Sequence, residues 1–555
     1  MTTYWYRIEA PREEEALYVR YVLRAHGLLY PWALQTTRGR ERRKVIRILV
    51  GKTVSKMEAK EIEILPPLAE LVLSTDAVVL RKLGLSVRPE AVCGGVGYVF
   101  AAEARTIAPE VALPLPVSCL RGLDVTASGW TNRYLLMEAE RQISPVAVSR
   151  SNSGTRLTVF ALDFVGLMDT AILGPREDSA GMPDVFEDWA EAYGTTLTQN
   201  LARTPIIDYS ICMIRALLFD ICSGAFPVEV DYYPDGKTAP LLITGDTDDA
   251  TAGQLETYFQ KLESHGARGT VIIKAFRAYS EEALLSARIE GHAFGIHPYG
   301  RTATVKAYQR SFRELLGQYR QLFQDAPCAI RNHRFQWVGR TGCLGPAIRG
   351  GVYFDMNCVA ANGQNWLGSG SGVAFPIPFP PIGGRFSPHP LHLPTIIEDD
   401  VLLHDLEYCY RPFENGDSFS VDAAISFLDD WVLKERWPAA VNFHPEHTTL
   451  TIRQLIDSVL SWAERKGVWM PSLIEFGGWL KSRDECEIQV IEGSTGSQVL
   501  VIAPVSVALR FYYRGTRSME CTPARAGTSW WHMTAHNTKA DSAAFREVAN
   551  EVPYD

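Results

Sequence analysis

The sequence predicts an α/β protein whose central part is a distorted (β/α) barrel. Between residues 239 and 483, short apolar runs typical of buried strands alternate with longer stretches in which apolar residues recur at helical spacing. This alternation is typical of a parallel sheet with crossover helices, and about seven repeats are enough to close it into a barrel. The chain has 555 residues, more than a single hydrophobic core usually organises, so we expect additional domains.

Four segments are expected along the chain. Residues 1–205 mix helical and strand-like stretches, which predicts an N-terminal mixed α/β domain of unknown role. Residues 206–238 end in the turn-rich DYYPDGK and are expected to connect this domain to the barrel at 239–483. Residues 484–555 show short segments of alternating polar and apolar residues, which predict a small β-rich domain.

The individual elements follow from the same periodicities. In the first segment we expect a helix at Glu13–His26 and strands at Val45–Val50 and Val146–Arg150. The strands expected in the barrel are PLLIT, GTVIIKA, HAFGIHP, CAIRNHR, GVYFDMN and AAVNFHP. Its expected helices are Ala250–Ser264, Ser280–Glu290, Val305–Phe323, Val421–Arg436 and Ile452–Lys466.

Composition and charge argue against several classes of function. The net charge of −9 comes without a clustered basic stripe, so nucleic acid is not an expected partner. No segment has eighteen uninterrupted apolar residues, and no membrane span is expected. The first residues lack a basic stretch followed by an apolar one, so we expect a cytoplasmic protein. The ten cysteines have no CxxC spacing, which favours reduced, buried thiols.

Three aspartates follow the first predicted barrel strand, in the sequence LLITGDTDD. A parallel barrel places reactive groups at the carboxyl ends of its strands, where Asp246, Asp248 and Asp249 are expected. Clustered carboxylates repel one another unless a cation or a proton lies between them. A second interpretation stays open at this point, because Asp248 or Asp249 would also suit the N-cap of the helix expected to follow.

Two histidines come after other predicted strands in the same way. His297 lies in GIHPYG and His333 in IRNHR, each after a short apolar run. One aspartate and two neutral imidazoles form a set of three protein ligands that suits zinc or a comparable divalent metal, with positions left for water and substrate. The three residues together predict a metal site formed by Asp248, His297 and His333.

A third histidine, His444, ends the strand-like run AAVNF. The proline after it stops the strand, so the imidazole is expected to face the mouth of the barrel, where it is a candidate general acid. His447 is expected to be a neighbouring or exposed residue. His292 has the opposite strand parity to His297 and is expected to pack in the interior or to contact a metal ligand from behind, and not to be a ligand itself.

These motifs resemble those of the NodB-type polysaccharide deacetylases, a family of distorted (β/α) barrels that remove acetyl groups from sugars with a divalent metal. The resemblance covers residues 240–483. The usual motifs are TFDDG, GHEIGNHTxxH, RxPxG and LxxHP, and the second family histidine falls on Arg301 here, which cannot bind a metal. A divergent branch with HDVD, HPSY, RxHxL and YDS motifs corresponds better to GDTD, HPYG, RNHRF and YFDMN, and there His333 replaces the missing ligand.

The resemblance implies a role for each matched residue. Asp246 corresponds to the general base, Arg331 to the cation that orients it, and His444 to the acid that protonates the leaving group. The metal ligands are then Asp248, His297 and His333. An alternative register makes Asp248 the base and Asp249 a ligand. Asp355 and Glu475 are matched more weakly and are expected near the site.

The expected function is therefore hydrolysis of the N-acetyl group of a carbohydrate, with a divalent metal, most consistent with zinc, as cofactor. A positioned acid favours an amide over an ester, because an amine leaves only when protonated. Two alternatives stay open: a barrel that binds a carbohydrate or protein partner without catalysis, and an amidohydrolase acting on a small non-sugar amide. The sequence predicts no particular oligomeric state.

Overall fold

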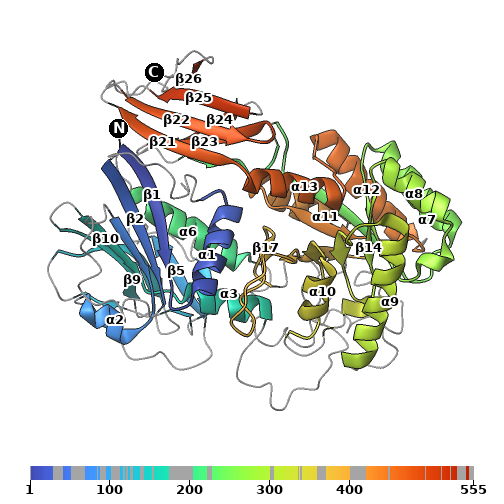
Figure 1. The fold of residues 1–555 in the computed structure, drawn as a ribbon, viewed down its shortest axis with the longest axis horizontal. Helices are drawn as coiled ribbons and strands as arrows, with labels where there is room; N and C mark the ends of the chain where they lie inside the picture. Colours follow the sequence, from blue (N-terminus) through green and yellow to red (C-terminus); the bar gives the residue numbers. More distant parts are fainter. Residues whose placement is uncertain are drawn as a thin grey trace. The chain divides into compact units, whose positions relative to one another are not determined.

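A computed structural model of the chain gives its architecture (Figure 1). The structure describes residues 2–28, 42–51, 69–83, 85–87, 96–101, 113–116, 119–120, 123–125, 129–137, 143–152, 155–173, 204–221, 228–234, 236–299, 305–335, 337, 341–358, 371–399, 421–447, 450–493, 496–513, 516–524, 527–533 and 545–548. Two compact units are present. One contains residues 1–167, 209–236 and 481–555, and the other contains residues 168–208 and 237–480.

The second unit is built on a sheet of nine strands in the order β17-β18-β16-β15-β14-β13-β12-β20-β19, a half-barrel. All neighbours are parallel except β17 and β18. The strands are β12 (Leu241–Thr247), β13 (Thr270–Ile273), β14 (Ala293–Ile296), β15 (Ala329–Ile330), β16 (Phe354–Asp355), β17 (Ile377–Pro378), β18 (Leu391–His392), β19 (Thr395–Glu398) and β20 (Ala439–Asn442). The parallel sheet is confirmed, and its two end strands are unpaired with each other in the described part of the chain.

Helices connect the strands of this sheet or follow its last strand, β20. They are α7 (Ala252–Ser264), α8 (Glu281–Ile289), α9 (Val305–Phe323), α10 (Leu344–Gly350), α11 (Val421–Leu428), α12 (Leu450–Lys466) and α13 (Leu473–Asp484), with a π-helical turn at Asp429–Lys434 after α11. Five of the expected helices are present to within a few residues, if α11 is taken together with the π-helical turn that continues it. In Figure 1, α8 and α9 lie beside β14, on which they pack.

The N-cap of α7 corrects one interpretation of the aspartate run. Thr251 caps this helix: its hydroxyl accepts from the backbone N–H of Gln254, whose side chain accepts in turn from the Thr251 N–H. This reciprocal capping box satisfies two donors of the first turn. Neither Asp248 nor Asp249 is therefore needed as the cap.

The first unit is dominated by a sheet of twelve strands in the order β26-β25-β22-β21-β1-β2-β3-β10-β9-β8-β5-β6. Its strands are β1 (Thr2–Glu9), β2 (Arg42–Val50), β3 (Ala69–Leu73), β5 (Val96–Ala101), β6 (Leu113–Pro116), β8 (Thr131–Met137), β9 (Ile143–Asn152), β10 (Thr155–Phe160), β21 (Glu487–Gly493), β22 (Gly496–Ala503), β25 (Gly527–Met533) and β26 (Phe545–Val548). Smaller sheets join β11 (Val228–Val230) with β23 (Val507–Tyr513) and β24 (Thr516–Ala524), and β4 (Ser86–Val87) with β7 (Leu123–Asp124). The helices are α1 (Glu13–Ala25), α2 (Ala77–Lys82), the beginning of α3 (Phe164–Leu173), which continues into the second unit, and most of α6 (Ile206–Ile221).

The structure groups the chain differently from the four expected segments. The C-terminal strands do not stand apart, because β21 pairs antiparallel with β1, with Thr2 opposite Glu492. The expected connecting segment contains α6 and β11 and is divided between the two units. Among the described helices, none combines the length and the apolar character needed to cross a bilayer.

Candidate active site

The predicted site residues gather at the carboxyl edge of the nine-stranded sheet. Asp246 lies near the end of β12, a strand buried along its whole length, and Asp248 follows it. His297 follows β14, His333 comes three residues after β15, and His444 comes two residues after β20. Because these strands are parallel, their carboxyl ends share one edge, and side chains distant in sequence meet there.

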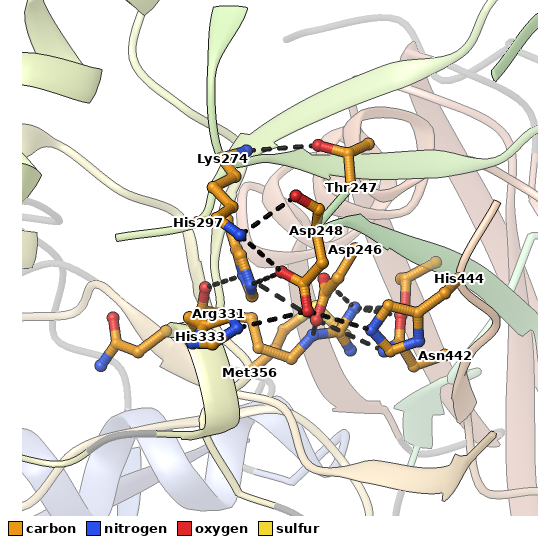
Figure 2. Close-up of polar contacts among 12 residues, drawn as sticks. Asp246, Thr247, Asp248, Lys274, His297, Arg331, His333, Met356, Asn442 and His444 are labelled. Carbon is orange, nitrogen blue, oxygen red and sulfur yellow. Dashed lines mark hydrogen bonds and ion pairs between the residues drawn. The ribbon is translucent and has the colours of Figure 1, made fainter. Parts of the chain in front are cut away.

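Three side chains converge on the carboxylate of Asp248 (Figure 2). One of its oxygens, Oδ1, lies 3.0 Å from Nε2 of His297. The other, Oδ2, lies 3.4 Å from Nε2 of His333 and 3.9 Å from Nε2 of His444. His297 and His333, whose Nε2 atoms are potential metal ligands, thus lie beside the Asp248 carboxylate, and His444 lies on a further side of it.

The hydrogen bonds of His297 give the chemical meaning of this cluster. Its Nδ1–H donates to the backbone carbonyl of Arg331 at 2.7 Å, so in the neutral ring the Nε2 lone pair points at the Asp248 carboxylate. Two acceptors face each other at 3.0 Å, an arrangement that requires a proton or a cation between them. Burial lowers the pKa of His297, but the Asp246 and Asp248 carboxylates outweigh this effect and the pKa is raised. Burial likewise acts to raise the pKa of Asp248, yet His297 and His333 hold it well below its usual range.

The donor set fits a divalent metal. One ligand atom from each of Asp248, His297 and His333 lies within 4.8 Å of the others, and two imidazoles with one carboxylate are ligands that zinc accepts. The Nδ1–H bond of His297 is the kind of outer contact that fixes a ligating imidazole in the correct tautomer. Asp248, His297 and His333 would hold the ion.

A second group of possible ligands, Asp399, His444 and His447, is better explained by hydrogen bonding. Nδ1 of His444 lies 2.6 Å and Nδ1 of His447 2.9 Å from the Asp399 carboxylate. These are donor–acceptor distances of hydrogen bonds, and together they engage both oxygens of the Asp399 carboxylate. The backbone N–H of His444 also donates to Asp399 at 2.8 Å.

Arg331 holds the carboxylate of Asp246. The guanidinium is completely buried, and its Nε lies 3.1 and 3.0 Å from the two Asp246 oxygens, with Nη2 2.9 Å from Oδ1. The other guanidinium donors reach hydroxyls of Thr395 and Thr244 at 3.0 and 2.8 Å. A buried charge persists only when it is paired and hydrogen-bonded in this way, so Asp246 is fixed as an ionic partner at the edge of the cluster.

Asn442 links Asp246 to the side of the site that contains His444. Its carbonyl oxygen accepts from Nη2 of Arg331 at 2.7 Å, while its amide nitrogen donates to Asp246 at 3.3 Å and to Glu398 at 3.0 Å. Glu398 is itself buried, 3.7 Å from Nδ1 of His444. The two halves of the site are therefore joined by one completely buried amide.

Asp399 orients His444. Because Nδ1–H of His444 donates to Asp399, Nε2 is directed toward the Asp248 cluster. Burial acts to raise the pKa of Asp399, but the His444 and His447 rings lower it, so the carboxylate stays ionised. A buried carboxylate behind an imidazole stabilises the protonated ring, and the pair is suited to donate a proton from Nε2.

The remaining predicted residues lie elsewhere. Asp249 is 94% exposed and its side chain does not join the cluster, so the geometry gives no support to the alternative aspartate register. Asp355 is buried beside β15 and accepts from Asn357, and burial raises its pKa to about 7. Glu475 lies on α13 and is not brought to the site. It accepts from the Trp469 indole, and the first residue of α13 donates its backbone N–H to Thr270 at the opposite end of β13. Arg301 lies outside the described residues.

Three residues of the site were missed by sequence reasoning, and each had a signal. Asp399 comes shortly after the run TII, as Asp248 comes shortly after LLIT, and Lys274 directly follows TVII. Asn442 has the same strand parity as His444, two residues later. His292, by contrast, is buried between Gly269 and Glu263, which confirms its expected packing role.

Comparison with known proteins gives structural likenesses only. No protein-family model matches the chain, and no curated protein sequence matches it. Among solved structures, the carbohydrate deacetylase Agd3 is similar over 99% of both chains, with 9% identity and a TM-score of 0.38. The polysaccharide deacetylase Bc1974 from Bacillus cereus is similar over 42% of this chain and 91% of its own, with 14% identity and a TM-score of 0.24. The peptidoglycan deacetylase PdaC from Bacillus subtilis is similar over 45% and 95%, with 10% identity and a TM-score of 0.26. At these scores the likenesses do not establish the activity of this chain.

Proposed function

We propose that this chain is a metal-dependent hydrolase that removes the N-acetyl group from a carbohydrate. The observation that carries the proposal is the arrangement around Asp248: a set of ligands that fits a divalent ion lies between a carboxylate held by an arginine and an imidazole held by a carboxylate. Hydrolysis of an amide needs these three functions in one place. The carbohydrate part of the proposal is supported by the motif resemblance.

The residues divide the chemistry between them. A divalent metal bound by Asp248, His297 and His333 would lower the pKa of a water and stabilise negative charge on a carbonyl oxygen. Asp246, fixed by Arg331, accepts the proton that this water loses as its oxygen attacks the acetyl carbon. His444, protonated and backed by Asp399, gives a proton from Nε2 to the nitrogen as the C–N bond breaks. Acetate and a free amine are the products.

The test is metal-dependent release of acetate from a panel of N-acetylated monosaccharides, N-acetylglucosamine oligomers and N-acetylated amino acids. We expect release from sugars by the zinc-loaded protein and a loss of at least ~1,000-fold in Asp248→Asn, since both the metal and the water are affected. Asp249→Asn is the matched control, because this neighbour is 94% exposed and outside the cluster. Release from none of the sugars, or equal activity of the two variants, would contradict the proposal; release from amino acids alone would move the substrate to small amides.

A further inference from the structure

Lys274 is an ammonium group held at the edge of the ligand cluster. It is the first residue after β13, and its Nζ donates to the backbone carbonyl of Asp248 at 3.1 Å. The same nitrogen lies 4.0 Å from Oδ1 of Asp248 and 4.8 Å from the centre of the Tyr299 ring. The side chain is only 24% exposed. A lysine usually keeps its flexible stem and its charge in water, so this placement is a specific feature of the site.

The Lys274 ammonium has more N–H donors than acceptors near it among the described residues. It carries three N–H groups, and the Asp248 carbonyl is its only acceptor within hydrogen-bonding distance among the described residues. The nearest carboxylate oxygens, on Asp248 and Asp249, are both at 4.0 Å, which is too far for a hydrogen bond. Two N–H groups are therefore available to a molecule that enters the site.

Lys274 and His444 lie on different sides of the Asp248 carboxylate. Lys274 is near Oδ1, the oxygen that also faces His297, whereas His444 is near Oδ2 (Figure 2). In the proposed reaction the amide nitrogen meets His444 and the attacking water meets Asp246. A carbonyl oxygen that lies on the remaining side would meet Lys274.

We propose that Lys274 is a catalytic residue that donates an N–H to the acyl oxygen while that oxygen carries negative charge; this inference rests on the proposed function. Water oxygen bonds to the acetyl carbon, Asp246 takes the water proton, and the C=O π electrons move to the oxygen beside Lys274. They return as the C–N bond breaks and His444 protonates the nitrogen. A donor that is already positioned for the charged oxygen stabilises the transition state more than the bound substrate, so it lowers the activation barrier.

A simpler role for Lys274 would be to neutralise Asp248 and Asp249. The two roles give different results when the charge is removed. An ammonium near the ligand carboxylate opposes a bound divalent cation in either case, so Lys274→Met is expected to bind zinc about tenfold more tightly, by removal of a like charge. Only the catalytic role predicts that the same variant is slower, by ~100-fold in kcat with little change in KM.

The experiment measures zinc affinity by chelator competition and kcat and KM by acetate release, for wild type, Lys274→Met and Lys274→Arg. Lys261→Met is the matched control: Lys261 is a partly exposed lysine of α7 that pairs with Asp457 of α12. We expect Lys274→Arg to keep more activity than Lys274→Met, and the control to match wild type. Tighter zinc binding with unchanged kcat in Lys274→Met would overturn the catalytic role.

Binding of acetate to the zinc-loaded protein gives a readout that does not depend on turnover. If Lys274 contacts the acyl oxygen, Lys274→Met should weaken acetate binding about tenfold relative to Lys261→Met, the loss of one charged contact. Unchanged acetate affinity overturns the inference even if wild type is an active deacetylase. A wild type that cleaves no N-acetyl sugar but loses acetate binding in Lys274→Met contradicts the proposed function and leaves the contact established.

Discussion

Replacing Asp399 with asparagine should disable His444 without changing the size of either side chain. In the native site, Asp399 accepts from the His444 ring, from the His444 backbone N–H and from His447. An amide has one acceptor oxygen and one NH₂ group. The backbone N–H cannot change its proton, so the amide oxygen must face it, and the NH₂ group is turned toward Nδ1 of His444.

The magnitude follows from this fixed orientation. The His444 ring must then present a lone pair at Nδ1. In the protonated ring, which is the proposed acid, Nδ1–H and the asparagine NH₂ group would be two donors face to face. The charge-assisted bond at 2.6 Å is lost, which costs about 1.5–3 kcal/mol, and an unmatched donor pair adds about 1–3 kcal/mol. Together these values correspond to a decrease of roughly 10²–10⁴-fold in kcat for an amide.

The assay compares two substrates. An N-acetyl sugar needs a proton on its leaving nitrogen, whereas an aryl acetate has a leaving group that departs as an anion. We expect Asp399→Asn to lose ~1,000-fold on the amide and less than about tenfold on the ester. Zinc content is measured on the same samples, because Asp399 is not among the proposed ligands. Equal losses on both substrates, or undiminished amide hydrolysis, would refute the assignment of His444 as the acid.

Two further predictions concern pH. Because the pKa of His297 is raised, protonation of this ring stabilises the metal-free protein below about pH 6.5, the ordinary histidine pKa, and this stability is lost as pH rises through the raised pKa. The free energy of urea unfolding should therefore fall above about pH 6.5 in the metal-free protein but not in the zinc-loaded protein. The same pH dependence in both would argue against an ion at His297. Burial raises the pKa of Asp355 to about 7, so the contribution of its protonated form to the free energy of unfolding is lost as pH rises from about 4 through 7. Asp355→Asn should remove up to about 4 kcal/mol of this pH dependence. An unfolding free energy that depends on pH as in wild type would contradict this prediction.

The sequence predicted the elements of the second unit because local patterns determine them. The helices at α7, α8, α9 and α12 follow an apolar stripe, and each chain segment after β12, β14, β15 and β20 delivers its polar residues to the same edge. The helix after Thr251 was placed correctly for the same reason, although Thr251 itself, with its partner Gln254, was not recognised as the cap. Local chemistry was thus sufficient to predict that Asp248, His297, His333 and His444 lie close together at one edge of the sheet.

The parts that the sequence did not predict depend on contacts between distant residues. A period-2 pattern indicates a strand but not its neighbour, so the pairing of β21 with β1 was not foreseen. Asp399 and Lys274 had the same signal as Asp248, but their roles are defined by His444 and by the Asp248 carbonyl, which only the fold brings near. Asn442 lies inside an apolar strand, where nothing local indicates its partners.

The central claim is that Asp248, His297 and His333 hold one divalent ion, and elemental analysis of the purified protein tests it most directly. The variants are His333→Ala, which removes a proposed ligand, and His447→Ala, which removes a member of the neighbouring hydrogen-bonded group. The account predicts about one zinc or similar ion per chain in wild type and in His447→Ala, and none in His333→Ala. No metal in wild type, or metal that is kept in His333→Ala and lost in His447→Ala, would contradict it.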